Sequence, residues 1–154
     1  MTPFQKKGFE IRKKYIPSHF STYLRNYFTL RAQTDPSLKG DSQAPNSHCV
    51  YGDPAFDMVM AMSTHDIGEI VGKNLIPQYT YARIYKNGSV LERHRDRPEC
   101  QYSITLCLGG EYDKQWPIWI KDYDGNDHCV GLDEGDMVVY HGTDLEHWRE
   151  EFEG

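Results

Sequence analysis

The chain has 154 residues, which suits one domain with a hydrophobic core and is too short for two domains of ordinary size. Hydrophobic residues make up 38% of the sequence and aromatic residues 13%, so the composition is that of a folded protein and excludes a largely disordered one. The net charge of −6 argues against a general nucleic-acid-binding protein, because such a protein needs a basic surface.

Cysteine spacing and hydropathy limit the cellular setting. The cysteines show no pairing of the kind found in zinc fingers, and we expect four reduced thiols: Cys49, Cys100, Cys107 and Cys129. No hydrophobic run is long enough to span a membrane, and no signal-peptide pattern follows the lysines of residues 1–14. These features predict a cytoplasmic protein without membrane contact, and they leave the oligomeric state open.

Residues 1–75 are expected to be mainly helical. Phe9–Tyr15 is predicted to be a first strand at the edge of a sheet. Pro17-Ser18 then opens a helix, because large hydrophobic residues recur at helical spacing: Phe20, Leu24, Tyr27 and Phe28. Asp35–Ser47 is rich in proline, serine, glycine and aspartate, which predicts a surface loop.

A second helical region starts at Asp53-Pro54, a capping residue followed by proline at the first helical position. The hydrophobic residues that follow, up to Val71, give one or two amphipathic helices, with a break expected near Ser63-Thr64. The methionines of this region are expected to fill the core: Met58, Met60 and Met62.

From residue 76 onward the pattern changes to short strands. Asn87-Gly88 is typical of a hairpin turn and predicts that the runs on either side of it pair. Trp116–Lys121 and Cys129–Leu132 are two further strands, joined by a turn at Asp124-Gly125-Asn126. Helices followed by a run of strands indicate an α+β fold, and the number of strands fits a double-layered jelly roll.

Gln101–Leu108 is a strand with two different faces. Its bulky residues should pack under the helices: Tyr102, Ile104, Leu106 and Leu108. The residues between them are small and weakly polar, and should leave room for a ligand on the opposite face: Ser103, Thr105 and Cys107.

The most specific chemical signal is the spacing of His94, Asp96 and His147. His94 and Asp96 are two residues apart, so an extended strand would point both side chains to one face. His147, delivered by a distant strand, would complete a set of two imidazoles and one carboxylate. This set, with the opposite positions left open, is typical of non-haem Fe(II) oxygenases, and zinc or manganese also fits it.

The order of elements around these residues resembles the 2-oxoglutarate/Fe(II)-dependent oxygenases, most closely their prolyl-hydroxylase-like branch. The resemblance covers about Pro77–Phe152: a tyrosine-bearing strand, a turn, the His-x-Asp motif, two further strands, a Gly-Asp turn, a short strand and the distal histidine. It implies a double-stranded β-helix with N-terminal helices packed on one sheet. Residues 1–154 would form one domain, with a helical part at 1–75 and a jelly-roll core at 76–154.

The resemblance also implies an enzyme that uses Fe(II), 2-oxoglutarate and O₂, with ascorbate as an accessory reductant. It would hydroxylate a peptidyl substrate, prolyl residues included, or a small molecule. His94, Asp96 and His147 would form the catalytic metal site, and Tyr85 would line the cofactor pocket.

The sequence offers two candidates for the residue that anchors the distal carboxylate of 2-oxoglutarate. The family usually places an arginine or lysine on a strand beyond the distal histidine. The sequence ends at Gly154, shortly after His147, so this strand is expected to be missing. Arg149 is the first candidate, with a salt bridge to Glu146 or Glu150 as its alternative role. Arg83 is the second, because it shares a strand face with Tyr85.

Two other functions agree with the same residues. One is a cupin-like zinc metalloprotein acting as a hydrolase or isomerase. The other is a non-catalytic jelly-roll binding module with a vestigial site, which the missing strand favours and the intact ligand set opposes. The arginines around the His-x-Asp motif favour an acidic substrate segment: Arg93, Arg95 and Arg97.

Overall fold

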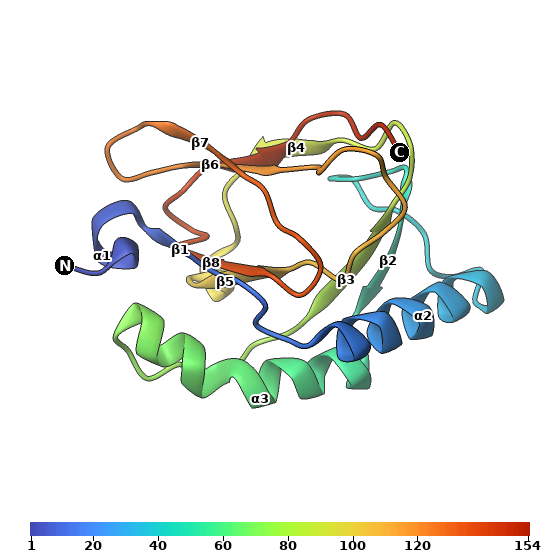
Figure 1. Cartoon of the computed structure of the whole chain (residues 1–154), viewed down its shortest axis with the longest axis horizontal. Coiled ribbons are helices and arrows are strands. Elements are labelled where there is room, and N and C mark those ends of the chain that lie inside the picture. The colour runs from blue at the N-terminus through green and yellow to red at the C-terminus, as the bar shows by residue number, and fades with distance from the viewer.

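The computed structural model describes residues 1–154 as three α-helices, one 3₁₀ helix and nine short strands (Figure 1). The helices are α1 (Pro3–Lys7), α2 (Ser18–Thr34), α3 (Pro54–Val71) and the 3₁₀ helix η1 (Pro98–Cys100). The strands are β1 (Phe9–Arg12), β2 (Ser47–Tyr51), β3 (Tyr81–Tyr85), β4 (Leu91–His94), β5 (Ser103–Leu106), β6 (Ile118–Lys121), β7 (Asp127–Val130), β8 (Met137–Tyr140) and β9 (His147–Arg149). None of the helices is both long and apolar enough to cross a membrane.

All strand pairs are antiparallel, and they form three sheets with the orders β4-β9-β6-β7, β1-β8-β5 and β2-β3. The four-stranded sheet lies at the top of Figure 1, and α2 and α3 run along the bottom beneath the other strands. The predicted combination of helices with antiparallel sheets is therefore confirmed. The N-terminal part also contributes strands, because β1 forms the expected sheet edge and β2 pairs with β3.

Strand β8 separates the two main parts of the core. Val138 and Tyr140 face the four-stranded sheet and pack in a cluster with Ile118 and Ile120 of β6. Met137 and Val139 point the other way, into a cluster with residues of α3. A strand buried on both faces needs hydrophobic residues at every position, and all four residues of β8 are buried.

Asp53 joins α2 to α3. As predicted, it caps α3, because its carboxylate accepts a hydrogen bond from the backbone N–H of Ala55 at 2.8 Å. The same carboxylate accepts the hydroxyl of Tyr27 at 2.8 Å and is ion-paired with Arg31, both of α2. The two helices thus share one buried charge.

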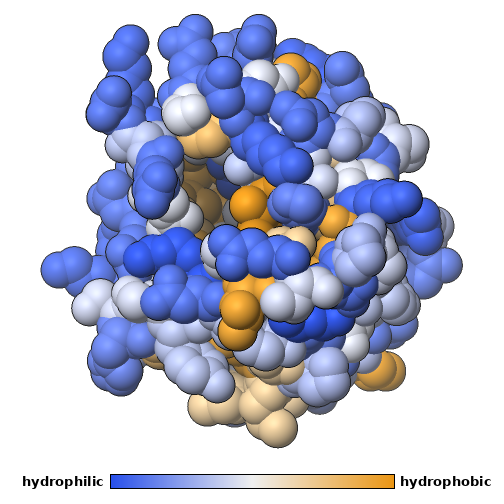
Figure 2. Space-filling model, turned by 90° about the vertical axis from the view of Figure 1, so that its right-hand side faces the viewer, coloured by the Kyte–Doolittle hydropathy of each residue, from blue (hydrophilic) through white to orange (hydrophobic).

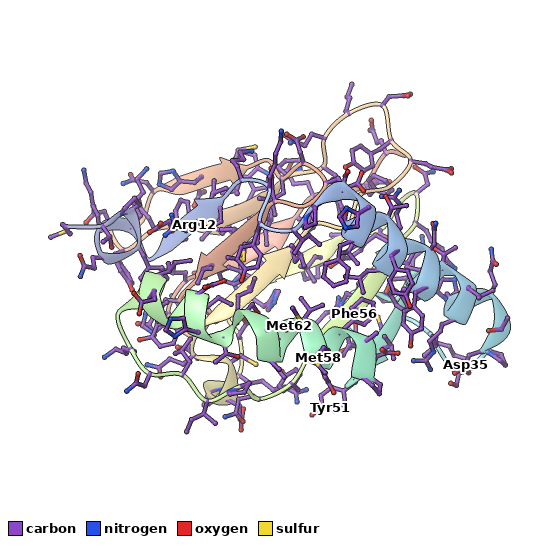
Figure 3. The ribbon with its side chains drawn as sticks, turned by 60° about the horizontal axis from the view of Figure 1, so that its bottom comes forward. Arg12, Asp35, Tyr51, Phe56, Met58 and Met62 are labelled. Atoms are coloured by element: carbon purple, nitrogen blue, oxygen red, sulfur yellow. The ribbon has the colours of Figure 1, made fainter.

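Helix α3 differs from its prediction in two ways. It continues without a break through Ser63 and Thr64, whose hydroxyls donate to the backbone carbonyl of Met60 within the same helix. Met58 and Met62 are 59% and 69% exposed, so these two do not fill the core as expected. Figure 3 shows both on the outward side of α3.

The hairpin predicted at Asn87-Gly88 is wrong. The turn exists, and Gly88 has the left-handed φ of 83° that such a turn requires. However, β3 pairs only with β2, and β4 pairs with β9, so the turn carries the chain from one sheet to another. The hydroxyl of Ser89 fixes the segment, because it accepts from the N–H of Lys86 at 2.9 Å and donates to the carbonyl of Asn46.

The two-faced strand Gln101–Leu108 is confirmed in part. Leu106 packs against both of the hydrophobic clusters that contain residues of the helices. Tyr102 packs against one of these clusters and Leu108 against the other. Ile104 is 39% exposed because β5 lies at the edge of its sheet. On the opposite face, Ser103 and Thr105 reach groups inside the fold, namely Asp96 and Tyr140.

The β6-β7 hairpin is held by the buried carboxylate of Asp122. It accepts hydrogen bonds from the backbone N–H groups of Asp124 and Asn126 at 2.9 Å each, and His128 Nε2 lies 2.7 Å away. Burial opposes ionisation, but these hydrogen bonds outweigh it and lower the pKa of Asp122 to about 2. The hairpin matters for the site because β6 pairs with β9, which begins at His147.

We expect Asp122→Asn to lower the free energy of unfolding by about 1–3 kcal/mol at pH 7, because it removes a charged acceptor. The pKa in the folded state lies below its value of about 3.9 in an unfolded chain. The stabilisation is therefore fully present above about pH 4 and is lost as the pH falls towards 2. Urea unfolding should show a clearly larger difference between variant and wild type at pH 7 than at pH 2.5, where the stabilisation is already partly lost. Asp124→Asn, in the same turn, is the control, and an equal difference at both pH values would exclude the charge as the cause.

Candidate metal centre

The two histidines lie on neighbouring strands. His94 is the last residue of β4 and His147 the first of β9, and they are direct partners in the antiparallel register. On the other side, His147 pairs with Ile120 of β6. His147 is therefore held between two strands and is only 1% exposed.

Asp96 reaches the histidines by a route that the sequence did not predict. Strand β4 ends at His94, so Asp96 lies in the loop that follows and not on the strand. The loop is fixed at this point, because the backbone N–H of Asp96 donates to the carbonyl of Gly142 at 2.8 Å. The hydroxyl of Ser103 donates to Asp96 Oδ2 at 2.5 Å and orients the carboxylate.

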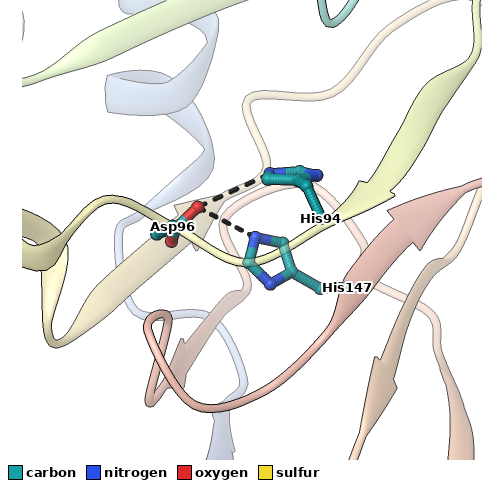
Figure 4. Close-up of side chains that lie close together, drawn as sticks. All are labelled: His94, Asp96 and His147. Atoms are coloured by element: carbon teal, nitrogen blue, oxygen red, sulfur yellow. Dashed lines mark hydrogen bonds and ion pairs between the residues drawn. The ribbon is translucent and has the colours of Figure 1, made fainter.

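One donor atom from each of the three side chains converges on a single region (Figure 4). These atoms all lie within 4.8 Å of one another. Asp96 Oδ1 is 3.1 Å from His147 Nε2 and 3.5 Å from His94 Nε2. The structure thus brings together the three side chains that the spacing selected.

Both imidazoles are oriented by backbone carbonyls. Nδ1 of His94 lies 2.6 Å from the carbonyl of Glu92, and Nδ1 of His147 lies 2.8 Å from the carbonyl of Leu145. A carbonyl can only accept, so Nδ1 carries the proton in each ring and the lone pair of a neutral ring is on Nε2. Two lone pairs and a carboxylate oxygen facing one point suit a divalent cation, and a carbonyl behind each ring is the usual support of a metal ligand.

The charges agree with this interpretation. Burial alone would raise the pKa of Asp96, but hydrogen bonds from Nε2 of His147 and His94, which form when those rings are protonated, and from the Ser103 hydroxyl hold this pKa well below its usual range. Burial alone would lower the pKa of His94, but its contacts with Asp96 and the Glu92 carbonyl give a net increase. The carboxylate is therefore ionised and strongly favours a positive charge beside it.

Arg149, the first candidate for the cofactor anchor, follows His147 by two residues, so both lie on one face of β9. Its guanidinium is 4.6 Å from the ring centre of Trp116 and 5.7 Å from that of Tyr85. Nη1 donates to the carbonyl of Trp116 at 2.8 Å. Neither of the alternative ion pairs forms, because Glu146 pairs with Arg93 and Arg95 and no carboxylate lies within 4.0 Å of Arg149. Arg149 is therefore a cation without a counter-ion beside Tyr85.

Arg83, the second candidate, lies on the inner face of β3, because Ala82 and Ile84 of the same strand pack on the helices. Unlike Arg149, it is ion-paired: Nη2 donates to Asp41 Oδ2 at 2.7 Å. Nη2 also donates to Gln43 Oε1 at 2.8 Å. The other terminal nitrogen, Nη1, is buried and has no hydrogen-bond partner.

An open cavity of about 410 Å³ adjoins Asp96. Its lining has no hydrophobic side chain and consists of Asp96, Pro98, Gln101, His141, Thr143 and Asp144. His141 stacks on Tyr102 with ring centres 5.0 Å apart, and its Nδ1 lies 2.9 Å from the Tyr123 hydroxyl. At the other end of the molecule, where β2 and β3 lie, Figure 2 shows a hollow with hydrophobic residues in its depth and hydrophilic residues around its rim.

Gly142 is a site residue that the sequence analysis missed. A Cβ at this position would overlap Asp96 Oδ2 and Ser103 Oγ, and would lie 2.9 Å from the backbone carbonyl of Cys100. Only glycine lets the loop before β9 approach the carboxylate this closely. No local signal in the sequence distinguishes it from an ordinary loop glycine.

We therefore expect Gly142→Ala to displace Asp96 and to weaken metal binding roughly 10–100-fold, as the loss of a ligand's support commonly does. Affinity for Co(II) or Zn(II) can be measured by competition with a coloured chelator. Asp96→Ala, which removes the ligand itself, should lose more. Gly110→Ala is the matched control, because its added Cβ would meet only the ring of Tyr112. Wild-type affinity in Gly142→Ala would show that this contact does not place the carboxylate.

Comparison with known proteins was made at the levels of sequence and structure. No family profile matches the sequence, and no curated protein is detectably similar to it. A crystal structure of a Pseudomonas putida prolyl-4-hydroxylase superposes with a TM-score of 0.79 at 17% identity, covering 96% of this chain and 87% of that one. HygX from Streptomyces hygroscopicus, solved with nickel, 2-oxoglutarate and hygromycin B, gives 0.74 at 14% identity over 100% and 83% of the two chains.

The third similar structure, OsALKBH1, gives a TM-score of 0.66 at 12% identity over 95% of this chain and 86% of that one. All three are 2-oxoglutarate/Fe(II) oxygenases. At these identities the likeness concerns the fold. The resemblance noted in the sequence is confirmed at that level, and the chain has the fold of the 2-oxoglutarate/Fe(II)-dependent oxygenases.

Proposed function

We propose that the protein is a 2-oxoglutarate- and Fe(II)-dependent dioxygenase that hydroxylates its substrate. The observation that carries this proposal is the convergence of His94, Asp96 and His147 on one point, with both Nδ1 atoms occupied by carbonyls. In this proposal the sheet β4-β9-β6-β7 and the strands beneath it are the two layers of a jelly roll. The metal centre lies on the inner side of the first layer.

The three ligands would hold Fe(II) through His94 Nε2, His147 Nε2 and an oxygen of Asp96. When bound, iron and 2-oxoglutarate supply the chemistry: O₂ is reduced while 2-oxoglutarate loses CO₂ to become succinate, and one oxygen atom enters a C–H bond of the substrate. The protein would contribute by positioning iron, cofactor and substrate and by excluding competing reactions. Ser103 and Gly142 keep the carboxylate in place, and the buried ring of Tyr140, 4.8 Å from His147, shields that side of the site from water.

We assign the distal carboxylate of 2-oxoglutarate to Arg149, with Tyr85 beside it. A dianion inside a protein needs a paired cation to offset the loss of hydration. Arg149 has no carboxylate partner, lies on the same face of β9 as His147 and touches Tyr85. The charge of Arg83 is already balanced by Asp41, which makes it the weaker candidate.

A peptidyl substrate, with prolyl residues included, and a small polar molecule both remain in the proposal. The polar cavity beside Asp96 supports a substrate that presents hydrogen-bonding groups near the metal. One similar structure is a prolyl-4-hydroxylase and another holds hygromycin B, so the fold accepts both classes.

The proposal is tested by titrating Fe(II) and then 2-oxoglutarate into the protein without oxygen. Chelation of the cofactor should produce a weak visible charge-transfer band that His147→Ala lacks. Admission of O₂ should release succinate, slowly in the absence of the substrate. A protein that binds Zn(II) tightly but gives neither band nor succinate would be a zinc metalloprotein or a binding module instead.

We expect Arg149→Gln to weaken 2-oxoglutarate binding by about 2–5 kcal/mol, the usual cost of losing one partner of a buried charge pair. Calorimetry on Zn(II)-loaded protein gives the dissociation constant without turnover, and the affinity for Zn(II) should not change. Arg93→Gln is the control, since that side chain covers Trp148 and pairs with Glu146. Normal cofactor binding by Arg149→Gln, together with a loss in Arg83→Gln, would move the anchor to Arg83.

A further inference from the structure

Only one of the two terminal nitrogens of the Arg83 guanidinium makes hydrogen bonds. Its side chain is 11% exposed, and it makes its ion pair and its contact with Gln43 through Nη2 alone. Nη1 is buried and has no hydrogen-bond partner. A buried donor without an acceptor is uncommon in folded proteins, because the donor loses its hydration without compensation. The position is therefore suited to an additional acceptor.

Asp41 does not fill the position because its oxygens are already occupied. Oδ1 accepts the backbone N–H groups of Gln43 and Ala44, at 3.1 Å and 2.9 Å. Oδ2 accepts the hydroxyl of Tyr81 and Nη2 of Arg83, both at 2.7 Å. An arginine binds a carboxylate best through two parallel N–H···O contacts, and this ion pair has one. A carboxylate whose oxygens do not accept hydrogen bonds from neighbouring backbone N–H groups can contact Nη1 and Nη2 of Arg83 at the same time.

Arg83 is placed on the side of the fold that carries the cofactor pocket of the proposed function. Tyr85 is two residues further along the same face of β3, which corresponds to roughly 6.6 Å. Tyr85 contacts Arg149, which shares a face of β9 with His147. Residues 35–46, which carry Asp41, run from the end of α2 to the inner side of β3 and can be followed in Figure 1 from α2 towards the C-terminus.

Charge balance decides what kind of ligand fits. A second anion added to the Arg83–Asp41 pair would leave an uncompensated negative charge in a buried place. A carboxylate that replaces Asp41 leaves the net charge unchanged and also satisfies Nη1. Asp41 is 31% exposed in its side chain and lies in a loop, so it is the partner that can leave.

We propose that Arg83 binds a carboxylate of the substrate, and that Asp41 occupies this position while the substrate is absent. This inference rests on the proposed function and narrows its substrate class to acidic molecules, either a peptide with an aspartate or glutamate side chain or a small organic acid. Binding would release Asp41 and with it the loop of residues 35–46. Arg93 and Arg95 contribute less, because both side chains are about half exposed to water, which screens their charge.

Acetate is the probe, with acetamide as its uncharged counterpart. Protein labelled with ¹⁵N-arginine and loaded with Zn(II) is titrated at constant ionic strength, and the Nε–H signal of Arg83 is followed, identified by its loss in Arg83→Lys. We expect Asp41→Asn to bind acetate at least tenfold more tightly than the wild type, and acetamide to cause no such shift. Asp35→Asn is the matched control, because it removes a carboxylate of the same loop that pairs with Arg31.

A second measurement uses the wild type and so does not depend on the fold of a variant. Acetate should accelerate hydrogen exchange of the Gln43 and Ala44 amides, which Asp41 holds, and acetamide should not. Equal acetate affinity in Asp41→Asn and wild type, or unchanged exchange, would overturn the proposal. So would displacement of acetate by 2-oxoglutarate, which would make Arg83 the cofactor anchor. The acetate titration of Zn(II)-loaded protein contains no 2-oxoglutarate, so its result can be interpreted even if 2-oxoglutarate does not bind. The two proposals can therefore fail separately.

Discussion

The contact on which the candidate metal centre depends is the approach of two imidazole Nε2 atoms to one oxygen of Asp96. Two lone pairs and a negative charge within 4.8 Å repel one another unless a cation or protons lie between them. The surrounding structure maintains this arrangement: carbonyls of Glu92 and Leu145 hold the rings, and Ser103 holds the carboxylate. A set of donors arranged at such cost is understandable if a metal ion supplies the compensating charge.

The layered architecture explains how the centre can be both rigid and accessible. β9 lies between β4 and β6, so His147 is fixed from both sides and buried. Asp96 comes from a loop and is fixed only by its contacts with Gly142 and Ser103. One hydrophobic cluster lies between β8 and the four-stranded sheet, and the other two lie between strands and the helices α2 and α3. The inner faces of β3 and β9 carry charged and aromatic side chains. The centre is thus supported by a packed core on one side and open on the other.

The sequence predicted those features that depend on local pattern or on ligand chemistry. The spacing of His94 and Asp96 selected side chains that do converge with His147, even though Asp96 lies beyond the strand, because a loop of fixed geometry serves as well. Asp53 was predictable because a helix cap is local. The pairing partner of β3 was not predictable. Asn87-Gly88 encodes a turn, but it does not determine which strands form backbone hydrogen bonds with the strands before and after that turn. Gly142 was not predictable either, because its role arises from a contact with a residue far away in the sequence.

The two arginines illustrate the same limit and also what the fold adds. In the sequence, Arg149 and Arg83 are similar candidates, each two residues from a residue of the expected site. In the structure they differ by one long-range partner: Asp41, from a segment predicted only as a surface loop, neutralises Arg83 and leaves Arg149 without a counter-ion. An arginine without a counter-ion suits a cofactor that is required in every turnover. An arginine paired with a carboxylate of the same chain suits a ligand that binds by displacing that carboxylate. The difference in pairing therefore supports the proposal that the two residues bind different ligands, although both lie on inner faces of the same fold.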